Sequence, residues 1–482
     1  MARIVPLLAA VALATLASAS RAQVPYEVHP VGATSTVFFP VGVDLGGRLV
    51  FGGIDPTNGR EPWISDGTLA GTFELADVHP TAGSNADRFF AAPSLGVVLF
   101  RANDGVLGDE LWKTDGTPAG TVPVKDIDAG ASGSNALFGA DLGGLVLFRA
   151  DDAAGGTGTE LWSTDGTTAG TQLVKDIRPG AASSNPAGNG FAVLGGFAYF
   201  QADDGTSGFE LWRSDGTATG TQLVADLNPG AASGGGTFPV AFGSLVLFVG
   251  NDGTTGTELF ATDGTTTSLV ADINPGASSS APSSFLVTPS HAYFLAFEPA
   301  TGQEVWRTDG VAVERVTDVA PGAGIGVFAQ TMCFVNGLVV FAADDGTGME
   351  LWATDGTPDT EVPISSTGGG VEFQSLGCEA GSVYFQANDG ASGDEPWVSD
   401  GSAAGTFALG DLNPGAGGSV SFDPGFAAAG GRVFFPATDG SGVALWAVDA
   451  AVAAVPALPG GFALVAAALV AAAGRSKLRG RR

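Results

Sequence analysis

Hydrophobic and polar residues along the chain alternate in short runs that fit β-strands. Leu145–Phe148 is apolar throughout, Glu160–Thr164 fits the next strand, and Thr171–Ile177 mixes polar with apolar positions. Such runs, bounded by Gly, Asp, Asn and Pro, are typical of strands joined by tight turns. Outside the two ends of the chain, no segment sustains the apolar period of a helix. The pattern therefore predicts an all-β protein.

A repeat of about fifty residues organises these strands. "GTELWSTDGTTAGTQLVKDIRPGAASSN" begins at Gly158, and the similar "GFELWRSDGTATGTQLVADLNPGAASGG" begins at Gly208. The motif Glu-Leu-Trp-x-x-Asp-Gly-Thr, or a variant, recurs at spacings of 45 to 50, with its aromatic residue at Trp63, Trp112, Trp162, Trp212, Phe260, Trp306, Trp352, Trp397 and Trp446. Its aspartates are Asp66, Asp115, Asp165, Asp215, Asp263, Asp309, Asp355 and Asp400. A period of this size with four strands is typical of a propeller blade. Residues 23–454 are thus predicted to form a β-propeller of about nine four-stranded blades, with eight as the alternative.

The two ends of the repeat region are complementary. The last unit carries Trp446 and Asp449 but continues into an alanine-rich stretch without an outer strand. "QVPYEVHP", which begins at Gln23, lies fifty residues before "FELADVHP", the outer strand of the first complete unit. The N-terminal segment is therefore predicted to supply the missing strand and to close the ring, which leaves no open blade edge.

The repeated motif is interpreted as a packing element. In a strand, Glu160 and Trp162 lie on one face and Leu161 on the other, so Trp and Leu should fill opposite interfaces between blades. The indole N–H of a buried Trp is expected to have a hydrogen-bond partner. Asp165 should turn its carboxylate onto the following backbone N–H groups as an Asx-turn, supported by a threonine hydroxyl.

Proline replaces the leucine of the motif in two units, at Pro62 and Pro396. Because proline has no N–H, it cannot donate to a strand ladder. The N–H at this position is therefore predicted to stay outside the ladder in every blade, at a bulge or a non-bonded position.

Oxygen-rich loops precede several motifs and suggest calcium as an alternative. The loops "NDGVLGDE", "DDGTSGFE" and "NDGASGDE" contain the candidate ligands Asp104, Asp203, Asp204 and Asp389. Hard cations take six to eight oxygen ligands, but these loops lack the spacing of an EF-hand. No catalytic residue is singled out, because the three histidines form no assembled set with a nucleophile or with metal ligands. No cofactor is therefore predicted, with calcium as the open alternative.

The sequences "ELWKTDGTPAGT", "ELWSTDGTTAGT" and "ELWRSDGTATGT", which begin at Glu110, Glu160 and Glu210, resemble the repeat of the bacterial ELWxxDGT repeat proteins. The match covers nearly all of residues 37–449. The resemblance implies an exported, propeller-like repeat protein. It implies no established reaction and provides no catalytic residues.

Both ends of the chain look like export signals. Residues 1–22 combine an early arginine, an apolar stretch and small residues, which predicts a signal peptide cleaved after Ala22. Residues 455–482 join "VPALP" to an apolar stretch and a basic cluster, an order similar to the C-terminal sorting signals of the PEP-CTERM kind. The alternative is a retained membrane anchor, although the apolar stretch is short for a span. Either interpretation predicts an exported protein, at the cell surface or released from it.

The charge of the chain narrows the range of partners. There are 20 Lys and Arg against 50 Asp and Glu. Removing the seven basic residues of the two ends leaves 13 − 50 = −37 for residues 23–458. Such a surface repels nucleic acid and anionic lipid, and it attracts divalent cations or basic partners.

The two cysteines, Cys333 and Cys378, lie in corresponding strands of consecutive units. Equivalent strands of adjacent blades are expected to stand too far apart for a bridge, whose Cα atoms must approach within about 7 Å. The sequence therefore favours two buried free thiols, with a disulfide as the alternative.

These observations lead to one functional expectation and two alternatives. The expectation is an exported, acidic, non-enzymatic propeller, monomeric, that binds an extracellular protein or polysaccharide or builds a surface layer. The first alternative is a calcium-dependent adhesion module. The second is a hydrolase or lyase that acts on a polysaccharide.

Overall fold

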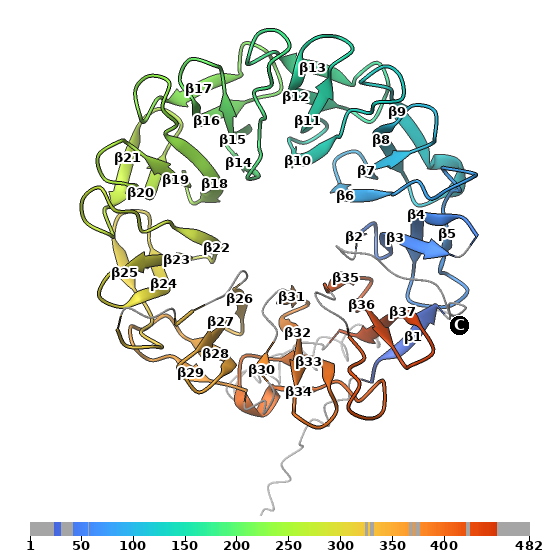
Figure 1. The fold of residues 1–482 in the computed structure, drawn as a ribbon, viewed down its shortest axis with the longest axis vertical. Coiled ribbons are helices and arrows are strands. Elements are labelled where there is room, and N and C mark those ends of the chain that lie inside the picture. The colour runs from blue at the N-terminus through green and yellow to red at the C-terminus, as the bar shows by residue number, and fades with distance from the viewer. Residues whose placement is uncertain are drawn as a thin grey trace, which may run out of the picture.

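The computed structural model describes residues 24–29, 42–55, 57–322, 326–327, 332–365, 370–371, 376–420 and 425–450. Within these residues, 37 strands form nine separate antiparallel sheets that stand as blades around one axis (Figure 1). Eight sheets have four strands and one has five. The predicted all-β propeller with nine blades is confirmed.

The blades are numbered by their order along the chain. Blade 1 contains β2 (Val43–Asp44), β3 (Leu49–Asp55), β4 (Gly59–Ser65) and β5 (Phe73–Glu74). Blade 2 contains β6 (Asp87–Ala92), β7 (Val97–Asn103), β8 (Asp109–Thr114) and β9 (Val122–Lys125). Blade 3 contains β10 (Leu137–Asp141), β11 (Val146–Asp152), β12 (Gly158–Thr164) and β13 (Gln172–Lys175). Blade 4 contains β14 (Phe191–Leu194), β15 (Phe197–Asp203), β16 (Phe209–Ser214) and β17 (Gln222–Ala225). Blade 5 contains β18 (Gly235–Phe242), β19 (Leu245–Asn251), β20 (Thr257–Thr262) and β21 (Thr267–Ala271).

The remaining blades follow the same plan with shorter first and last strands. Blade 6 contains β22 (Ser283–Val287), β23 (Ala292–Glu298), β24 (Gly302–Thr308) and β25 (Val313–Arg315). Blade 7 contains β26 (Cys333–Val335), β27 (Leu338–Asp344), β28 (Met349–Thr354) and β29 (Val362–Pro363). Blade 8 contains β30 (Gly370–Val371), β31 (Gly377–Glu379), β32 (Ser382–Asn388), β33 (Asp394–Ser399) and β34 (Phe407–Ala408). Blade 9 contains β35 (Ala427–Ala429), β36 (Arg432–Thr438) and β37 (Val443–Asp449), completed by β1 (Tyr26–His29). Two single-turn 3₁₀ helices, η1 (Pro118–Gly120) and η2 (Ala403–Gly405), lie in the last hairpins of blades 2 and 8.

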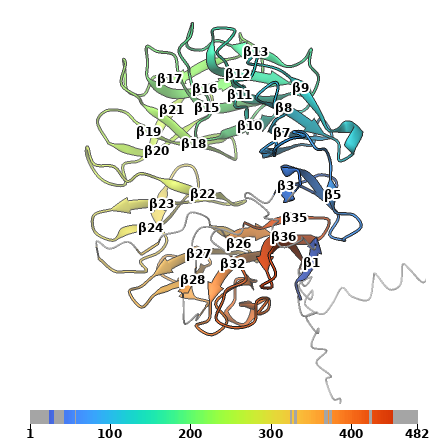
Figure 2. The same cartoon turned by 45° about the vertical axis from the view of Figure 1, so that its right-hand side comes forward.

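The N-terminal strand closes the ring, as predicted. β1 pairs antiparallel with β37, and Glu27 lies opposite Trp446 in that ladder. Val28 is only 1% exposed and belongs to the core between blades 9 and 1. Figure 2 shows β1 beside the last sheet of the chain. First and last segments of the repeat region therefore share one blade.

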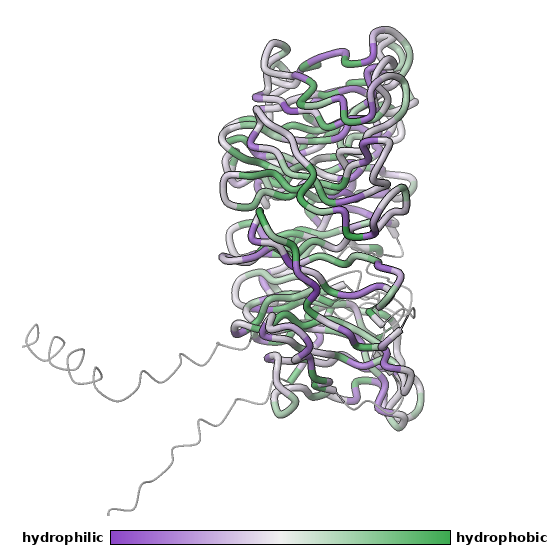
Figure 3. Tube along the Cα trace, turned by 90° about the vertical axis from the view of Figure 1, so that its left-hand side faces the viewer, coloured by the Kyte–Doolittle hydropathy of each residue, from purple (hydrophilic) through white to green (hydrophobic). Residues whose placement is uncertain are grey.

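The hydrophobic core consists of seams between blades, because each blade is apolar on both faces. Leu161 packs in the seam toward blade 4 together with Phe200, whereas Trp162 packs in the seam toward blade 2 together with Leu111. The predicted division of Trp and Leu between opposite interfaces is thus seen. In Figure 3, where the ring is viewed edge-on, apolar positions concentrate in the strands and many polar positions lie in the connecting loops.

The outermost strand of several blades is bulged at the position that the prolines pointed to. The register against the outer strand shifts between Leu161 and Trp162, and at the equivalent place in blades 2, 4 and 5. In blade 7, the Leu351 N–H donates to the Ser365 hydroxyl at 2.8 Å instead of to a strand carbonyl. The bulge is thus found in blades 2–5. In blades 1 and 8, which contain the prolines, the pairs with the outer strand begin one residue later, at Trp63 and Trp397, so the prolines lie outside that ladder.

The cysteines form a disulfide, which corrects our expectation of two free thiols. Cys333 lies in β26 and Cys378 in β31, with their Cα atoms 5.3 Å apart. Both strands lie at the edge of their sheets that is nearest the ring axis, and adjacent blades converge toward that axis (Figure 1). Equivalent positions on inner strands therefore come within bridging range, although equivalent positions farther out would not.

The predicted signal peptide (1–22) and C-terminal segment (455–482) lie outside the described residues, so both stay predictions. In the ranges that the structure does describe, no helix has the length and apolarity needed to cross a membrane.

Candidate functional site

The Asp of the motif forms a turn at the outer hairpin of each repeat. Asp165 Oδ1 accepts hydrogen bonds from the Thr167 N–H at 2.8 Å and from the Thr167 hydroxyl at 2.7 Å. These bonds stabilise the ionised form and lower the pKa of Asp165. The corresponding contacts occur at Asp66, Asp115, Asp215, Asp263, Asp309, Asp355 and Asp400. This is the Asx-turn expected from the sequence, and it keeps these carboxylates on their own loops.

The aromatic anchors are placed in the seams. Trp63, Trp112, Trp162, Trp212, Phe260, Trp306, Trp352 and Trp446 are each at most 9% exposed, and Trp397 is partly buried. One detail differs from expectation: Nε1 of Trp162 has no hydrogen-bond partner among the described residues. Instead, the Lys125 ammonium of blade 2 lies 5.6 Å from the Trp162 ring centroid. The face of the ring thus attracts a cation, whereas the indole N–H stays unpaired.

The Glu of the motif has a role that the sequence did not reveal. Glu160 is fully buried, and its carboxylate accepts the Ile177 N–H and the Ser184 N–H, both at 2.8 Å. Ser184 also donates its hydroxyl at 2.6 Å. These donors lie on the segment that leads to the next blade, so Glu160 fastens that linker to its own sheet. Burial raises the pKa of Glu160 although these bonds oppose the effect. The signal for this role was the Ser that recurs 22 to 24 residues after the Glu in several units.

The candidate calcium ligands are engaged by their own loops. Asp104 Oδ1 accepts the N–H groups of Val106 and Leu107, at 2.8 and 2.7 Å. Asp204 and Asp389 accept two backbone N–H groups each in the same way, and Asp203 contacts Arg178. Among the described residues, no group of three or more His, Cys, Asp or Glu is arranged to hold a metal ion. Calcium binding stays an open alternative.

Six basic side chains fasten one blade to the next. They donate to carbonyl groups in the outer hairpin of the following blade, at distances of 2.7 to 3.2 Å, in the pairs Arg48 with Gly116, Lys113 with Gly166, Lys125 with Thr171, Lys175 with Thr221, Arg213 with Gly264 and Arg432 with Asp66. These six contacts use nearly half of the thirteen basic residues in the propeller region. Their cationic groups are therefore committed to the ring itself.

A second group of arginines gathers in blades 1–4. Arg101 forms a bidentate pair with Asp87, at 2.9 and 2.7 Å, across β6 and β7. Arg149 occupies the equivalent position on β11, but the described residues contain no hydrogen-bond or ion-pair partner for it. Burial, and then the positive charge of Arg88, lower the pKa of Arg149. A half-buried guanidinium thus faces another cation instead of an anion.

The backbone explains how Arg88 comes to face blade 3. The register of β6 against β7 shifts between Asp87 and Phe90, and Arg88 within this bulge has φ 57°. This left-handed conformation is uncommon for a residue other than glycine, but it recurs in the equivalent bulges of blades 5 and 6, at Phe238 and Ser284, and so belongs to the repeat. Arg88 is exposed, and it lies on the innermost strand of its blade (Figure 1). The arginine pair is therefore accessible from outside the protein.

Comparison with known proteins gives structural likeness only. No family model and no curated protein matches the chain. Similar solved structures include puromycin hydrolase, with 14% identity, a TM-score of 0.36 and coverage of 64% of this chain and 50% of that one. Dipeptidyl peptidase 4 of Porphyromonas gingivalis has 12% identity and a TM-score of 0.43, with coverage of 86% and 59%. An oligogalacturonate lyase in complex with manganese has 11% identity and a TM-score of 0.37, with coverage of 89% and 96%. The chain thus spans about half the length of the puromycin hydrolase that it matches.

These comparisons overturn our expectation of a non-enzymatic module. The similar structures are a hydrolase, a peptidase and a lyase. The expectation rested on nine equivalent motifs that act as packing elements. That argument holds for the motif, but it says nothing about residues such as Arg88 and Arg149 that occur in one or two blades only.

Proposed function

We propose that the protein binds a carboxylate-bearing ligand at the inner part of blades 2 and 3, with Arg88 and Arg149 as anchors. The observation that carries the proposal is the position of Arg149, half-buried and beside a second arginine, with no anionic partner among the described residues. Two neighbouring cations repel each other, and an anion placed between them removes that repulsion. The planar fork of a guanidinium matches a carboxylate with two parallel hydrogen bonds.

The expected ligand is an acidic polysaccharide outside the cell. The propeller region has a net charge of −37, so most of its surface repels a polyanion. Binding is then confined to the one part of the ring where arginines outnumber their partners. An acidic polymer whose carboxylates repeat along the chain can offer one group to each arginine. The two arginines thus select for carboxylates, and the surrounding negative charge disfavours binding of the polyanion elsewhere on the surface.

The test compares Arg149→Gln with wild type in calorimetric titrations with oligogalacturonate. Gln already occupies the equivalent position in blades 4 and 8, at Gln201 and Gln386, so the variant should fold. A lost charged hydrogen bond costs about 1.5–3 kcal/mol, which corresponds to roughly 10- to 100-fold weaker binding. Arg307→Gln, which removes the same charge from blade 6, is the matched control and should bind like wild type.

Four further results complete the experiment. Neutral dextran should not bind, which would exclude recognition of sugar rings alone. Binding of poly-glutamate in place of oligogalacturonate would show an acidic peptide as the ligand and contradict the proposed class. Equal affinity of Arg149→Gln and wild type would contradict the site itself. Shortening of the oligogalacturonate during incubation would reveal a reaction in addition to binding.

A further inference from the structure

The buried glutamates of the motif differ in one donor. In blades 2, 3, 5 and 8, the linker to the next blade carries a serine whose hydroxyl donates to the glutamate, in the pairs Ser134 with Glu110, Ser184 with Glu160, Ser280 with Glu258 and Ser419 with Glu395. In blades 4 and 6, glycine replaces this serine, at Gly234 and Gly326. The glutamates of these two blades, Glu210 and Glu304, are those whose pKa burial raises to about 7.

The hydrogen-bond donors of Glu304 are placed less evenly than those of Glu210. In Glu210, the Leu227 N–H and the Gly234 N–H donate to different oxygens, at 3.1 and 2.6 Å. In Glu304, both donors reach Oε2, namely the Thr317 hydroxyl at 2.6 Å and the Val319 N–H at 3.3 Å. Oε1 of Glu304 has no partner in the described part of the chain, although the side chain is fully buried. A buried carboxylate oxygen without a donor is costly when it is charged.

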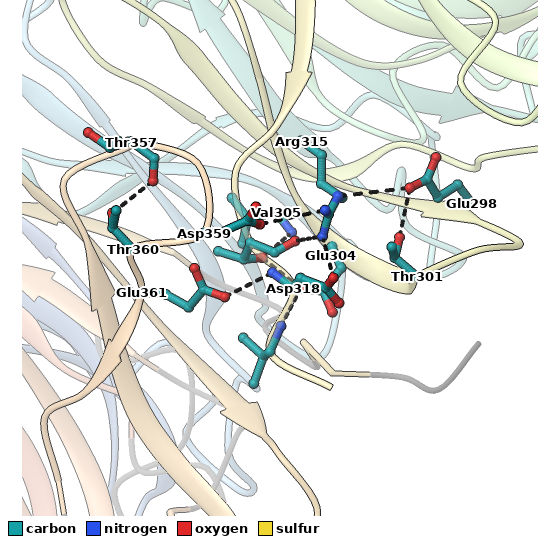
Figure 4. A network of polar contacts seen from close by, with 12 residues as sticks. Glu298, Thr301, Glu304, Val305, Arg315, Asp318, Thr357, Asp359, Thr360 and Glu361 are labelled. Carbon is teal, nitrogen blue, oxygen red and sulfur yellow. Dashed lines mark hydrogen bonds and ion pairs between the residues drawn. The ribbon is translucent and has the colours of Figure 1, made fainter. Parts of the chain in front are cut away.

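Two further carboxylates face Glu304. Asp318 lies on the linker that follows blade 6, and Glu361 comes from blade 7 and accepts the Asp318 N–H at 2.9 Å. Asp318 Oδ1 and Glu361 Oε2 also have no donor among the described residues. After burial, the negative charges of Asp318 and Glu361 contribute to the raised pKa of Glu304. Figure 4 shows the three side chains meeting where blades 6 and 7 adjoin.

The remaining charged groups at this place do not neutralise the cluster. Arg315 on β25 is the one cation in the described network, and it lies 3.1 Å from Asp318 Oδ2. It also contacts Asp359 of blade 7 at 3.5 Å and Glu298 of β23 at 3.9 Å. The single positive charge of Arg315 is thus shared among three carboxylates, and Glu304 and Glu361 add two more. The group can lower its charge only by taking up a proton or a cation.

We propose that the seam between blades 6 and 7 is a pH-sensitive joint of the ring. Glu304 takes up a proton from solvent and keeps it, and the resulting O–H donates a hydrogen bond to Asp318 or Glu361. The O–H then supplies the donor that the serine provides in other blades. When the pH rises and Glu304 loses this proton, three anions face one another and the joint loosens. This joint lies far around the ring from the arginine pair of blades 2 and 3 (Figure 1) and is independent of the proposed ligand site.

The sign of the effect follows from the two protonation equilibria. The folded-state pKa is about 7, whereas the ordinary value of a glutamate is 4.5. A group whose pKa is raised on folding contributes stability that is complete below its unfolded value and is lost as the pH rises through its folded value. Protection of the joint should therefore be high near pH 5 and low near pH 8.

Hydrogen–deuterium exchange on the full chain, corrected for intrinsic rates, tests the joint directly. Peptides that cover β25 and residues 357–365 should exchange at least about threefold faster at pH 8 than at pH 5.5, since the local opening equilibrium responds to the lost proton. Glu304→Gln carries a permanent N–H donor and no charge, so its seam should show little pH dependence. Peptides from the seam between blades 2 and 3 provide the internal control.

A second variant keeps the test decisive if Glu304→Gln does not fold. Gly326→Ser restores the hydroxyl found in blade 5 at Ser280, and the Glu304 carboxylate must shift slightly, because a Cβ there would lie 2.6 Å from its Oε1. This variant should move the midpoint of the exchange transition to lower pH. An unchanged pH dependence in both variants would overturn the proposal. Full protection of wild type at pH 8 on addition of calcium chloride would also overturn it, in favour of a cation site.

Discussion

At the scale of single residues, Trp162 combines two kinds of contact between blades. Its ring fills the seam toward blade 2 at 5% exposure. The Lys125 ammonium that lies over this ring also donates to the Thr171 carbonyl at 2.7 Å. Lys175 repeats the arrangement with Trp212 in the next seam. In these two seams, the motif therefore combines apolar packing with a cation that also binds a carbonyl of the next hairpin.

We expect Trp162→Ala to lower the free energy of unfolding by roughly 3–5 kcal/mol, because it leaves a cavity in the seam and removes the surface under Lys125. Urea denaturation followed by circular dichroism measures the change. Trp162→Phe is the matched control, since Phe260 fills this position in blade 5, and it should lose less than half as much. A Trp162→Ala protein that melts like wild type would show that this ring does not support the seam.

At the scale of elements, the sequence predicted the features that recur in every repeat. It did not predict contacts that depend on how close neighbouring blades come near the ring axis. Closure by β1 was visible because residues 23–30 share Val-His-Pro with the outer segment of blade 1. The bridge between Cys333 and Cys378 was missed because a linear repeat does not show how closely inner strands converge. Arg88 and Arg149 were missed as a pair because a bulge in β6 brings them together, and a bulge has no fixed sequence signature.

Deletion of residues 23–30 should destabilise the ring and promote self-association. It removes Val28 from the core and exposes the edge of β37, whose free N–H and C=O groups can pair with another chain. Thermal melting and light scattering measure the two effects. Addition of a synthetic peptide of residues 23–30 should restore the melting temperature and the monomer. An unchanged melting temperature and a monomeric truncated protein would contradict a structural role for this strand.

At the scale of the whole molecule, positive charge is used locally within a strongly acidic protein. Six basic side chains fasten neighbouring blades through carbonyl groups. The arginines without such a contact concentrate in blades 1–4, and Arg315 is surrounded by carboxylates at the joint of blades 6 and 7. The ring thus has two neighbouring arginines at blades 2 and 3 and a cluster of carboxylates at the joint of blades 6 and 7. The proposed ligand site and the proposed joint follow from this uneven distribution.

The same distribution leads to a prediction about divalent cations. The acidic surface should attract them, but the stability of the fold should not depend on them. The loop aspartates that resemble calcium ligands spend an oxygen on their own backbone, as Asp104 and Asp204 do with two N–H groups each. A carboxylate already satisfied in this way gains little from a metal ion. At physiological ionic strength, salt also screens weak attraction to the net charge beyond a Debye length of about 8 Å.

The melting temperature at pH 7 should therefore be the same in EDTA and in calcium chloride, within about 1 °C. For a large domain, such a shift corresponds to well under 1 kcal/mol. Differential scanning calorimetry in 0.15 M salt makes the comparison, and Asp204→Asn serves as its control, since the amide oxygen can accept the same two N–H groups. A melting temperature lowered by several degrees in EDTA, with this dependence lost in Asp204→Asn, would instead establish the calcium-dependent alternative.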